Sequence, residues 1–205
     1  MNSDVINRGI CFLVLGSLAI FLSACAASFQ VSGDVAQGQT ALFAGNYQGA
    51  QSHFQSAAQA DPNNVVSGGQ LRQGILSYLG RAQYLNGQLE AARATLQKAM
   101  AQPGSDNNLS LTQLYLGLTL ARLGDRQAGL PNIESGTKGI LDFLNYIQQN
   151  FRYSVGPLWD RGNGNRNAAN ANLAMIAGGN FDWPTLISNS EALAMRFERE
   201  AYDNE

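Results

Sequence analysis

Histidine, cysteine and charged side chains are scarce in this sequence of 205 residues. With one histidine, His53, and two cysteines, it offers few ligands for a metal ion or groups for catalysis. Charged residues make up 14%, and the formal net charge is −2 without a basic stripe, so nucleic-acid binding lacks electrostatic support. Neither a nucleophile elbow nor a phosphate-binding glycine motif after a strand is present. We expect no enzyme, no cofactor, no metal site and no nucleic-acid partner.

Long apolar runs are also lacking. The longest, from Ile10 to Leu22, has 13 residues, whereas a membrane-spanning helix needs about 20. It follows Arg8 and ends in Leu22-Ser23-Ala24-Cys25, where two small residues precede the cysteine. This ending resembles the lipobox of bacterial lipoproteins, so residues 1–24 are predicted to be a signal peptide. The alternatives are an uncleaved anchor and an ordinary secretory peptide.

The lipobox resemblance implies cleavage after Ala24 and covalent lipid on Cys25, the predicted lipidation site. Several acyl chains anchor a protein stably where one chain binds only marginally. Ala26, in place of aspartate, favours the outer membrane in the sorting rule of this class. Cys11 would be removed with the signal peptide, so the mature chain would have no free thiol and no disulfide. Residues 25–32 are expected to form the lipidated N-terminus and a tether.

The segment from Val31 to Asn64 has the spacing of a pair of packed helices. Gly38 falls at the small position of the first helix and Gly45 at its end, in the turn. One face of the second helix then carries small and aromatic residues in alternation: Tyr47, Ala50, Phe54 and Ala57. Asp61-Pro62 then ends the second helix. This pattern resembles the 34-residue tetratricopeptide repeat (TPR), except that Ala41 stands where the family usually has a large aromatic residue.

The same pattern recurs twice. A second unit fits residues 73–106, and a third begins near Ser110, with turn glycines at Gly87 and Gly124. The third is degenerate, because Gly129, Pro131 and Gly136 replace better helix formers, and Pro131 is expected in the first helical turn or at a kink. The fold class is therefore predicted to be an all-α, TPR-like solenoid with repeats over 33–150. No strand is predicted.

The remaining residues, 151–205, are predicted to be a loop followed by two capping helices. The loop, from Phe151 to Asn167, is rich in glycine and asparagine, and the run from Asp160 lacks the ligand spacing of an EF-hand. The helices are expected near Asn167–Ala177 and Pro184–Ala201, with Asp182 as N-cap of the second. Alternatively, Trp159 and Trp183 belong to a partner-binding surface.

In the TPR family the first helix of each repeat lines a concave groove that binds other proteins. The resemblance places seven candidate contact residues there: Gln39, Phe43, Tyr78, Arg81, Tyr84, Tyr115 and Arg122. Tyrosine and arginine suit a binding face, through large contact area and a planar fork of donors. The alternative is that a residue such as Tyr84 belongs to the core and packs against neighbouring helices.

The sequence thus predicts a non-enzymatic lipoprotein scaffold on the periplasmic side of the outer membrane. Its partner would be a segment of an envelope protein, such as a secretion, pilus or outer-membrane assembly component. Two alternatives stay open: a structural subunit that binds through its convex face and C-terminal helices, and an accessory protein that binds a small ligand near Trp159 and Trp183.

Overall fold

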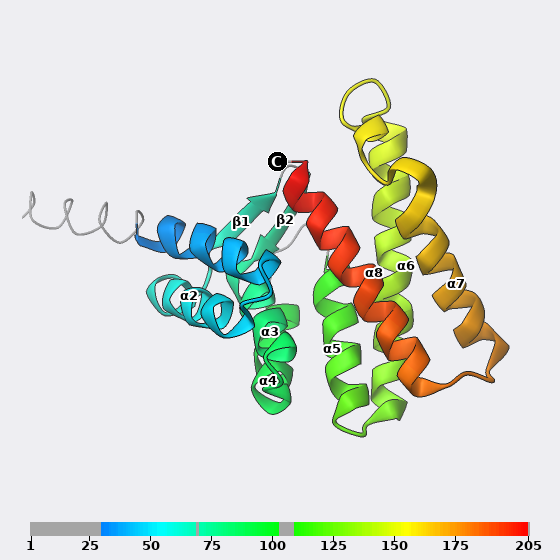
Figure 1. Ribbon diagram of the computed structural model, residues 1–205, viewed down its shortest axis with the longest axis horizontal. Helices are drawn as coiled ribbons and strands as arrows, with labels where there is room; N and C mark the ends of the chain where they lie inside the picture. Colours follow the sequence, from blue (N-terminus) through cyan, green and yellow to red (C-terminus); the bar gives the residue numbers. More distant parts are fainter. Residues whose placement is uncertain (1–29, 69, 103–108, 205) are drawn as a thin grey trace, which may run out of the picture.

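The computed structural model describes residues 30–68, 70–102 and 109–204 (Figure 1). The predicted signal peptide and the lipidation site Cys25 lie outside these residues. Of the predicted tether, residues 30–32 are described, and they are helical. The tether prediction is wrong for these three residues, since the first helix already includes them.

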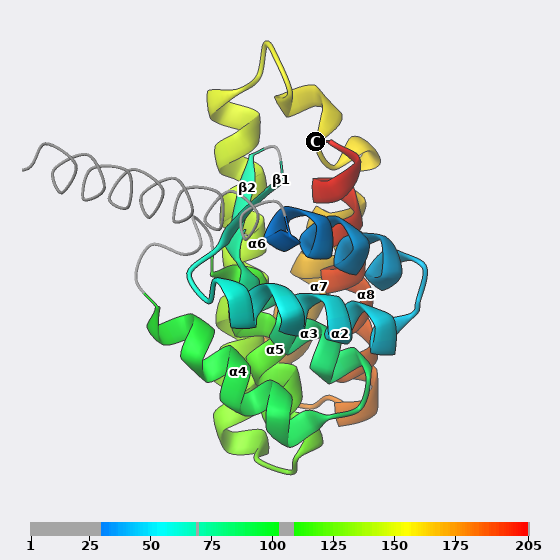
Figure 2. The ribbon, with the colours of Figure 1, turned by 90° about the vertical axis from the view of Figure 1, so that its left-hand side faces the viewer.

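Three helical hairpins follow one another, which confirms the predicted solenoid. The first pairs the helix over residues 30–43 with α2 (Tyr47–Ala60). The second pairs α3 (Ile75–Leu85) with α4 (Leu89–Ala101), and the third pairs α5 (Ser110–Arg122) with α6 (Arg126–Asn150). Figure 2 shows the first two hairpins stacked beside each other, with α5 and α6 behind them.

The turn of each hairpin depends on a glycine. Gly45, Gly87 and Gly124 have φ angles of +77°, +78° and +94°, a region that side chains with a Cβ rarely adopt. Each of these glycines lies two residues before the second helix begins, so the chain reverses there. The three glycines that the sequence places at turns are confirmed in that role.

A second glycine, seven residues before each turn, lets the two helices of a hairpin approach. A Cβ added at Gly38 would lie 2.5 Å from the Phe54 ring, and one at Gly80 would lie 2.6 Å from Leu96. At Gly117 it would lie 2.6 Å from the backbone nitrogen of Ile133. The facing residue is 16 positions later in all three cases, so the third repeat keeps the register of the others.

The third repeat is packed more closely than its composition suggests. Gly129 and Gly136 take the positions of the alanines in the earlier repeats, and both are buried against α5. A Cβ at Gly136 would lie 2.6 Å from the backbone nitrogen of Leu114. These glycines weaken helix propensity but allow backbone contact between α5 and α6. Pro131 is the sixth residue of α6, so it lies in the second turn and not in the first, the first of the two predicted alternatives.

A β-hairpin joins the first two repeats, which corrects the prediction of no strand. Strands β1 (Val65–Gly68) and β2 (Leu71–Gly74) pair antiparallel, with Val65 opposite Gly74. Each strand has only four residues, too few for alternation to show clearly in the sequence. Leu71 is buried against the second and third repeats and Val66 against the first, so the hairpin contributes to both parts of the core.

The C-terminal helices begin and end close to the predicted positions. Helix α8 (Trp183–Asp203) starts at the Asp182 carboxylate, which accepts a hydrogen bond from the Thr185 backbone N–H at 3.0 Å, confirming the predicted cap. Helix α7 (Gly164–Gly178) starts three residues earlier than expected. The Asp160 carboxylate explains this start, because it accepts from the backbone N–H of Asn165 and Arg166. Two 3-10 turns, Gly156–Leu158 and Arg161–Asn163, precede it.

Helix α8 runs diagonally across the repeats, beside α5 and α6, while α7 packs against α6 (Figure 1). Leu186, Leu193 and Phe197 on its inner side are fully buried. The Phe197 ring lies 5.6 Å from that of Phe143 and 5.9 Å from that of Trp159. Trp159 is therefore a core residue. Among the described residues, no helix is both long enough and apolar enough to span a membrane.

Candidate functional site

The predicted concave groove is occupied by the chain itself. Five of the seven predicted contact residues are at most 7% exposed: Gln39, Tyr78, Arg81, Tyr84 and Tyr115. Phe43 is half-buried and Arg122 is exposed. Helix α8 lies on the part of this face that carries Arg81, Tyr84 and Arg122, through Glu198 and Glu191. Gln39 and Tyr78 are buried against each other beside the core of the first repeat. The face is therefore not the open groove that was expected, and a partner would reach Arg81 and Tyr84 only if α8 moved.

A buried ion pair attaches α8 to the second repeat. The Arg81 guanidinium lies 2.8 Å from the Glu198 carboxylate, and both side chains are almost inaccessible to solvent. Arg81 also donates a hydrogen bond to Gln73 and lies 4.2 Å from the centre of the Tyr78 ring. Burial raises the pKa of Glu198, and the charge of Arg81 opposes that rise. Arg81, predicted as a contact residue of the groove, therefore interacts with a carboxylate of this chain.

A second ion pair, closer to the surface, attaches α8 to the third repeat. Arg122 lies 2.6 Å from Glu191, and the Tyr84 hydroxyl donates a hydrogen bond to the same carboxylate. Burial, followed by this contact with Glu191, raises the pKa of Tyr84. Glu191 and Glu198 are seven residues apart, two helical turns, so both lie on the side of α8 that faces the repeats.

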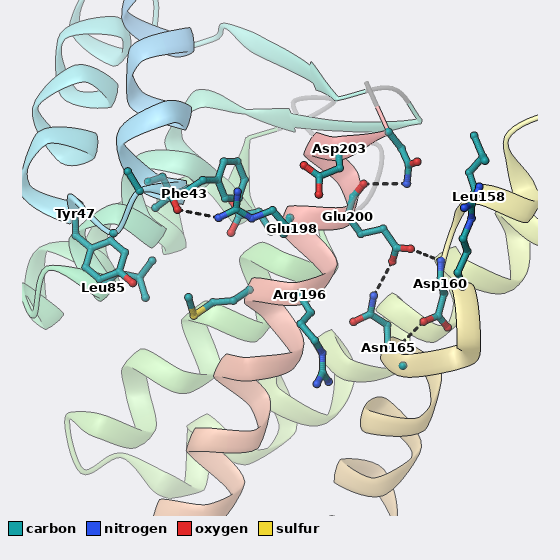
Figure 3. Close-up of a pocket in the computed structure, with 18 residues that line it drawn as sticks. Phe43, Tyr47, Leu85, Leu158, Asp160, Asn165, Arg196, Glu198, Glu200 and Asp203 are labelled. Carbon is teal, nitrogen blue, oxygen red and sulfur yellow. Dashed lines mark hydrogen bonds between the residues drawn. The ribbon is translucent and has the colours of Figure 1, made fainter.

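An open cleft lies beside the C-terminal end of α8, and we call it the lateral cleft. It has a volume of about 970 Å³, and its lining comes from residues 42–47, Leu85, residues 158–165 and the end of α8 from Met195 to Asn204. Figure 3 shows α8 along its floor, with Phe43, Tyr47 and Leu85 on one side and Leu158, Asp160 and Asn165 on the other. This volume falls within the range of binding sites in proteins.

The first wall of the lateral cleft is fastened to α8 through Phe43. Arg199 donates a hydrogen bond to the Phe43 carbonyl at 2.8 Å and lies over its ring at 4.5 Å. The Tyr202 ring is 4.6 Å from that of Phe43. Phe43 is therefore the predicted contact residue that borders an open surface, although its own ring is held by α8.

The second wall is fastened through Glu200. Its carboxylate accepts hydrogen bonds from the Asn165 side chain at 2.6 Å and from the Asp160 backbone N–H. Burial raises the pKa of Glu200, and these two hydrogen bonds oppose the rise. Asp160 has a φ of +52°, uncommon for a residue with a Cβ. Its carboxylate is also paired with Arg166 at 2.9 Å, which holds the wall at the start of α7.

The described residues contain no group of three or more histidine, cysteine, aspartate or glutamate side chains placed to hold a metal ion. His53 lies 3.3 Å from Asp34, and the Ser56 hydroxyl donates to the same carboxylate at 2.6 Å. The serine thus faces the aspartate rather than the imidazole, which is not the arrangement of a nucleophilic triad.

Sequence analysis did not identify the carboxylates of α8. Glu191 and Glu198 bind the two arginines of the concave face, and Glu200 holds the second wall of the cleft. The spacing of seven between Glu191 and Glu198 was the available signal, since it places both on the apolar side of an amphipathic helix.

Comparison with known proteins supports the repeat assignment. Residues 41–112 match the family described as tetratricopeptide repeat. The match runs from the last residues of the first helix through α2 and the second hairpin to the start of α5. This part of the chain is therefore similar to tetratricopeptide repeats, a module that in general binds other proteins. A search of curated proteins and a search of solved structures gave no match.

Proposed function

We propose that this protein is a non-enzymatic scaffold that binds an envelope protein in the lateral cleft. The observation that carries the proposal is the contrast between the two surfaces near α8: the concave face of the repeats is filled, whereas the lateral cleft is open. Tetratricopeptide repeats supply the general class, protein binding. Because the concave face is filled, we place the proposed contact in the adjacent lateral cleft and not at the residues predicted from the sequence.

We also propose that the scaffold is an outer-membrane lipoprotein that faces the periplasm. Support comes from the sequence Leu22-Ser23-Ala24-Cys25 after a 13-residue apolar run. In cells, a Cys25→Ser variant should remain as a full-length precursor and take up no labelled palmitate. Normal processing of this variant would contradict the lipid anchor and leave the binding proposal untouched.

Site-specific crosslinking in cells tests the binding proposal. A photoreactive amino acid at Leu158 reports on the lateral cleft, whereas the same group at Gln97, an exposed residue of α4 outside the cleft, is the matched control. We expect Leu158 to capture one defined envelope protein that Gln97 does not. Capture from Gln97 alone would instead favour binding through the convex face.

A further inference from the structure

The lateral cleft has one apolar side and one cationic side, separated by α8. Met195 and Arg199 are four residues apart, so they share the side of α8 that faces Phe43. Arg196 and Glu200 share the opposite side, toward the wall that carries Asp160. Figure 3 shows this division, with Phe43 and Arg196 on different sides of the helix.

The apolar side is exposed without a covering element. Met195 is 44% exposed and is one of the four large apolar side chains exposed in the described part of the chain. Another, Leu158, is 41% exposed but lies on the opposite wall, beside Asp160. Tyr47 and Leu85, each half-buried, extend the apolar surface next to Met195. Water is displaced favourably from such a surface by an apolar side chain of a partner.

Most charged groups of the cleft already have partners. Asp160 pairs with Arg166, Glu198 with Arg81, and Glu200 accepts from Asn165 and Asp160. Three exposed guanidinium groups of the lining, Arg161, Arg196 and Arg199, have no ion pair with any described residue. Arg199 is held by the carbonyl and the ring of Phe43, which leaves Arg161 and Arg196 on the other side of the cleft. Asp203 is the carboxylate in the lining that is likewise unpaired among these residues. The available charge is thus mainly positive.

We propose that the lateral cleft recognises a short protein segment that carries a bulky apolar residue and a carboxylate about three positions apart, in either order. The apolar residue lies against Met195, Tyr47 and Leu85, and the carboxylate binds Arg196 and Arg161. The spacing follows from the width of a helix, about 10 Å, and the rise of an extended chain, about 3.3 Å per residue. The inference rests on the proposed scaffold function and specifies the chemistry of its partner.

Fluorescence anisotropy with defined peptides tests this chemistry. Three labelled nonapeptides in a Ser/Gly background are titrated with the full chain: one carries Leu and Glu three positions apart, one replaces Glu with Gln, and one replaces Leu with Ser. We expect the Leu/Glu peptide to bind most tightly, and its affinity to fall with added salt. Equal affinity for the Glu and Gln peptides would overturn the proposal.

Variants of the protein assign the contacts. Arg161→Gln and Arg196→Gln should each weaken binding of the Leu/Glu peptide by up to about fivefold and leave the Gln peptide unaffected. Met195→Ser should weaken both peptides. Lys98→Gln removes an exposed charge on α4, outside the cleft, and should change neither. Loss of binding in Lys98→Gln as well would show a general charge effect and contradict the assigned site.

Two further outcomes separate the inference from the function on which it rests. Binding of the full chain to vesicles of anionic phosphatidylglycerol, lost in Arg161→Gln and Arg196→Gln while no peptide binds, would replace the peptide with a membrane surface. If crosslinking from Leu158 captures an envelope protein but none of the peptides binds, the scaffold function stands and the proposed chemistry is wrong.

Discussion

The inner and outer sides of α8 differ in their exposure to solvent and in the pairing of their charges, the two properties that separate a core from a binding surface here. On the inner side Phe197 and Glu198 are buried, and both carboxylates there, Glu191 and Glu198, are paired with arginines. On the outer side Met195 and Arg196 are exposed, and Arg196 has no ion pair among the described residues. Neighbouring positions of one helix thus have opposite roles, so substitutions on one side should change stability and those on the other should change binding.

The largest effect is expected from Phe197→Ala. Its ring is fully buried between Phe143 and Trp159, and such truncations cost about 3 to 5 kcal/mol of unfolding free energy. Met195→Ala, two residues away and exposed, should cost less than about 0.5 kcal/mol. Urea denaturation of both variants measures the difference. Equal losses would contradict the division of α8 into two sides.

The two ion pairs of α8 should also differ in their contribution to stability, with the buried pair contributing more than the exposed one. Arg81→Met leaves Glu198 buried without its partner, which costs about 3 kcal/mol, near the low end of the range because Glu198 can take up a proton instead. Arg122→Met breaks a pair that is 41% exposed on the arginine side and should cost at most about 1 kcal/mol. Chemical denaturation at pH 7 distinguishes them. A larger loss in Arg122→Met would place the main attachment of α8 at the third repeat.

Smaller effects are expected where helices of a hairpin touch. In Gly117→Ala the new methyl group meets the backbone of α6, which cannot move alone, so we expect a loss of about 2 kcal/mol. In Gly80→Ala it meets only the Leu96 side chain closely, and the gain in helix propensity offsets part of the cost. The midpoints of thermal unfolding should rank Gly117→Ala below Gly80→Ala. The reverse order would mean that the third repeat is the more loosely packed one.

The smallest effect concerns pH. Burial raises the pKa of Glu200, so the folded chain binds this proton more readily than the unfolded chain. The contribution of Glu200 to stability therefore increases as pH falls from 7 toward the ordinary value of 4.5. Melting temperatures of wild type and Glu200→Gln at pH 7, 6 and 5 should show wild type gaining relative to the variant. A relative loss on acidification would mean that the hydrogen bonds from Asp160 and Asn165 outweigh burial.

The repeats were predictable because their signals are local. Turn glycines such as Gly45, the small and aromatic pattern positions such as Gly38 and Phe54, and the cap at Asp182 each follow from neighbouring residues in one helix or one turn. The structure confirms these three features at the predicted residues. The short strands β1 and β2 gave too weak a pattern to be recognised.

The position of α8 was not predictable in the same way. Its amphipathic pattern showed that Leu186, Leu193 and Phe197 would be buried, but not which surface they would cover. Arg81 has the chemistry of a binding residue whether the carboxylate comes from another protein or, as here, from Glu198 of the same chain. Residue type therefore indicates the chemistry of the contact, whereas only the tertiary structure shows which carboxylate makes it.

The place of α8 in the chain determines when folding can finish. Every repeat is synthesised before Trp183, yet Phe143 packs against Phe197, and Tyr84 contacts Glu191, only when α8 arrives. A growing chain must therefore keep this apolar face uncovered until nearly all of it has been made, a state that attracts chaperones and aggregates readily. Truncation before Trp183 should accordingly produce a chain that is degraded in the cell, rather than a shorter scaffold with an accessible groove.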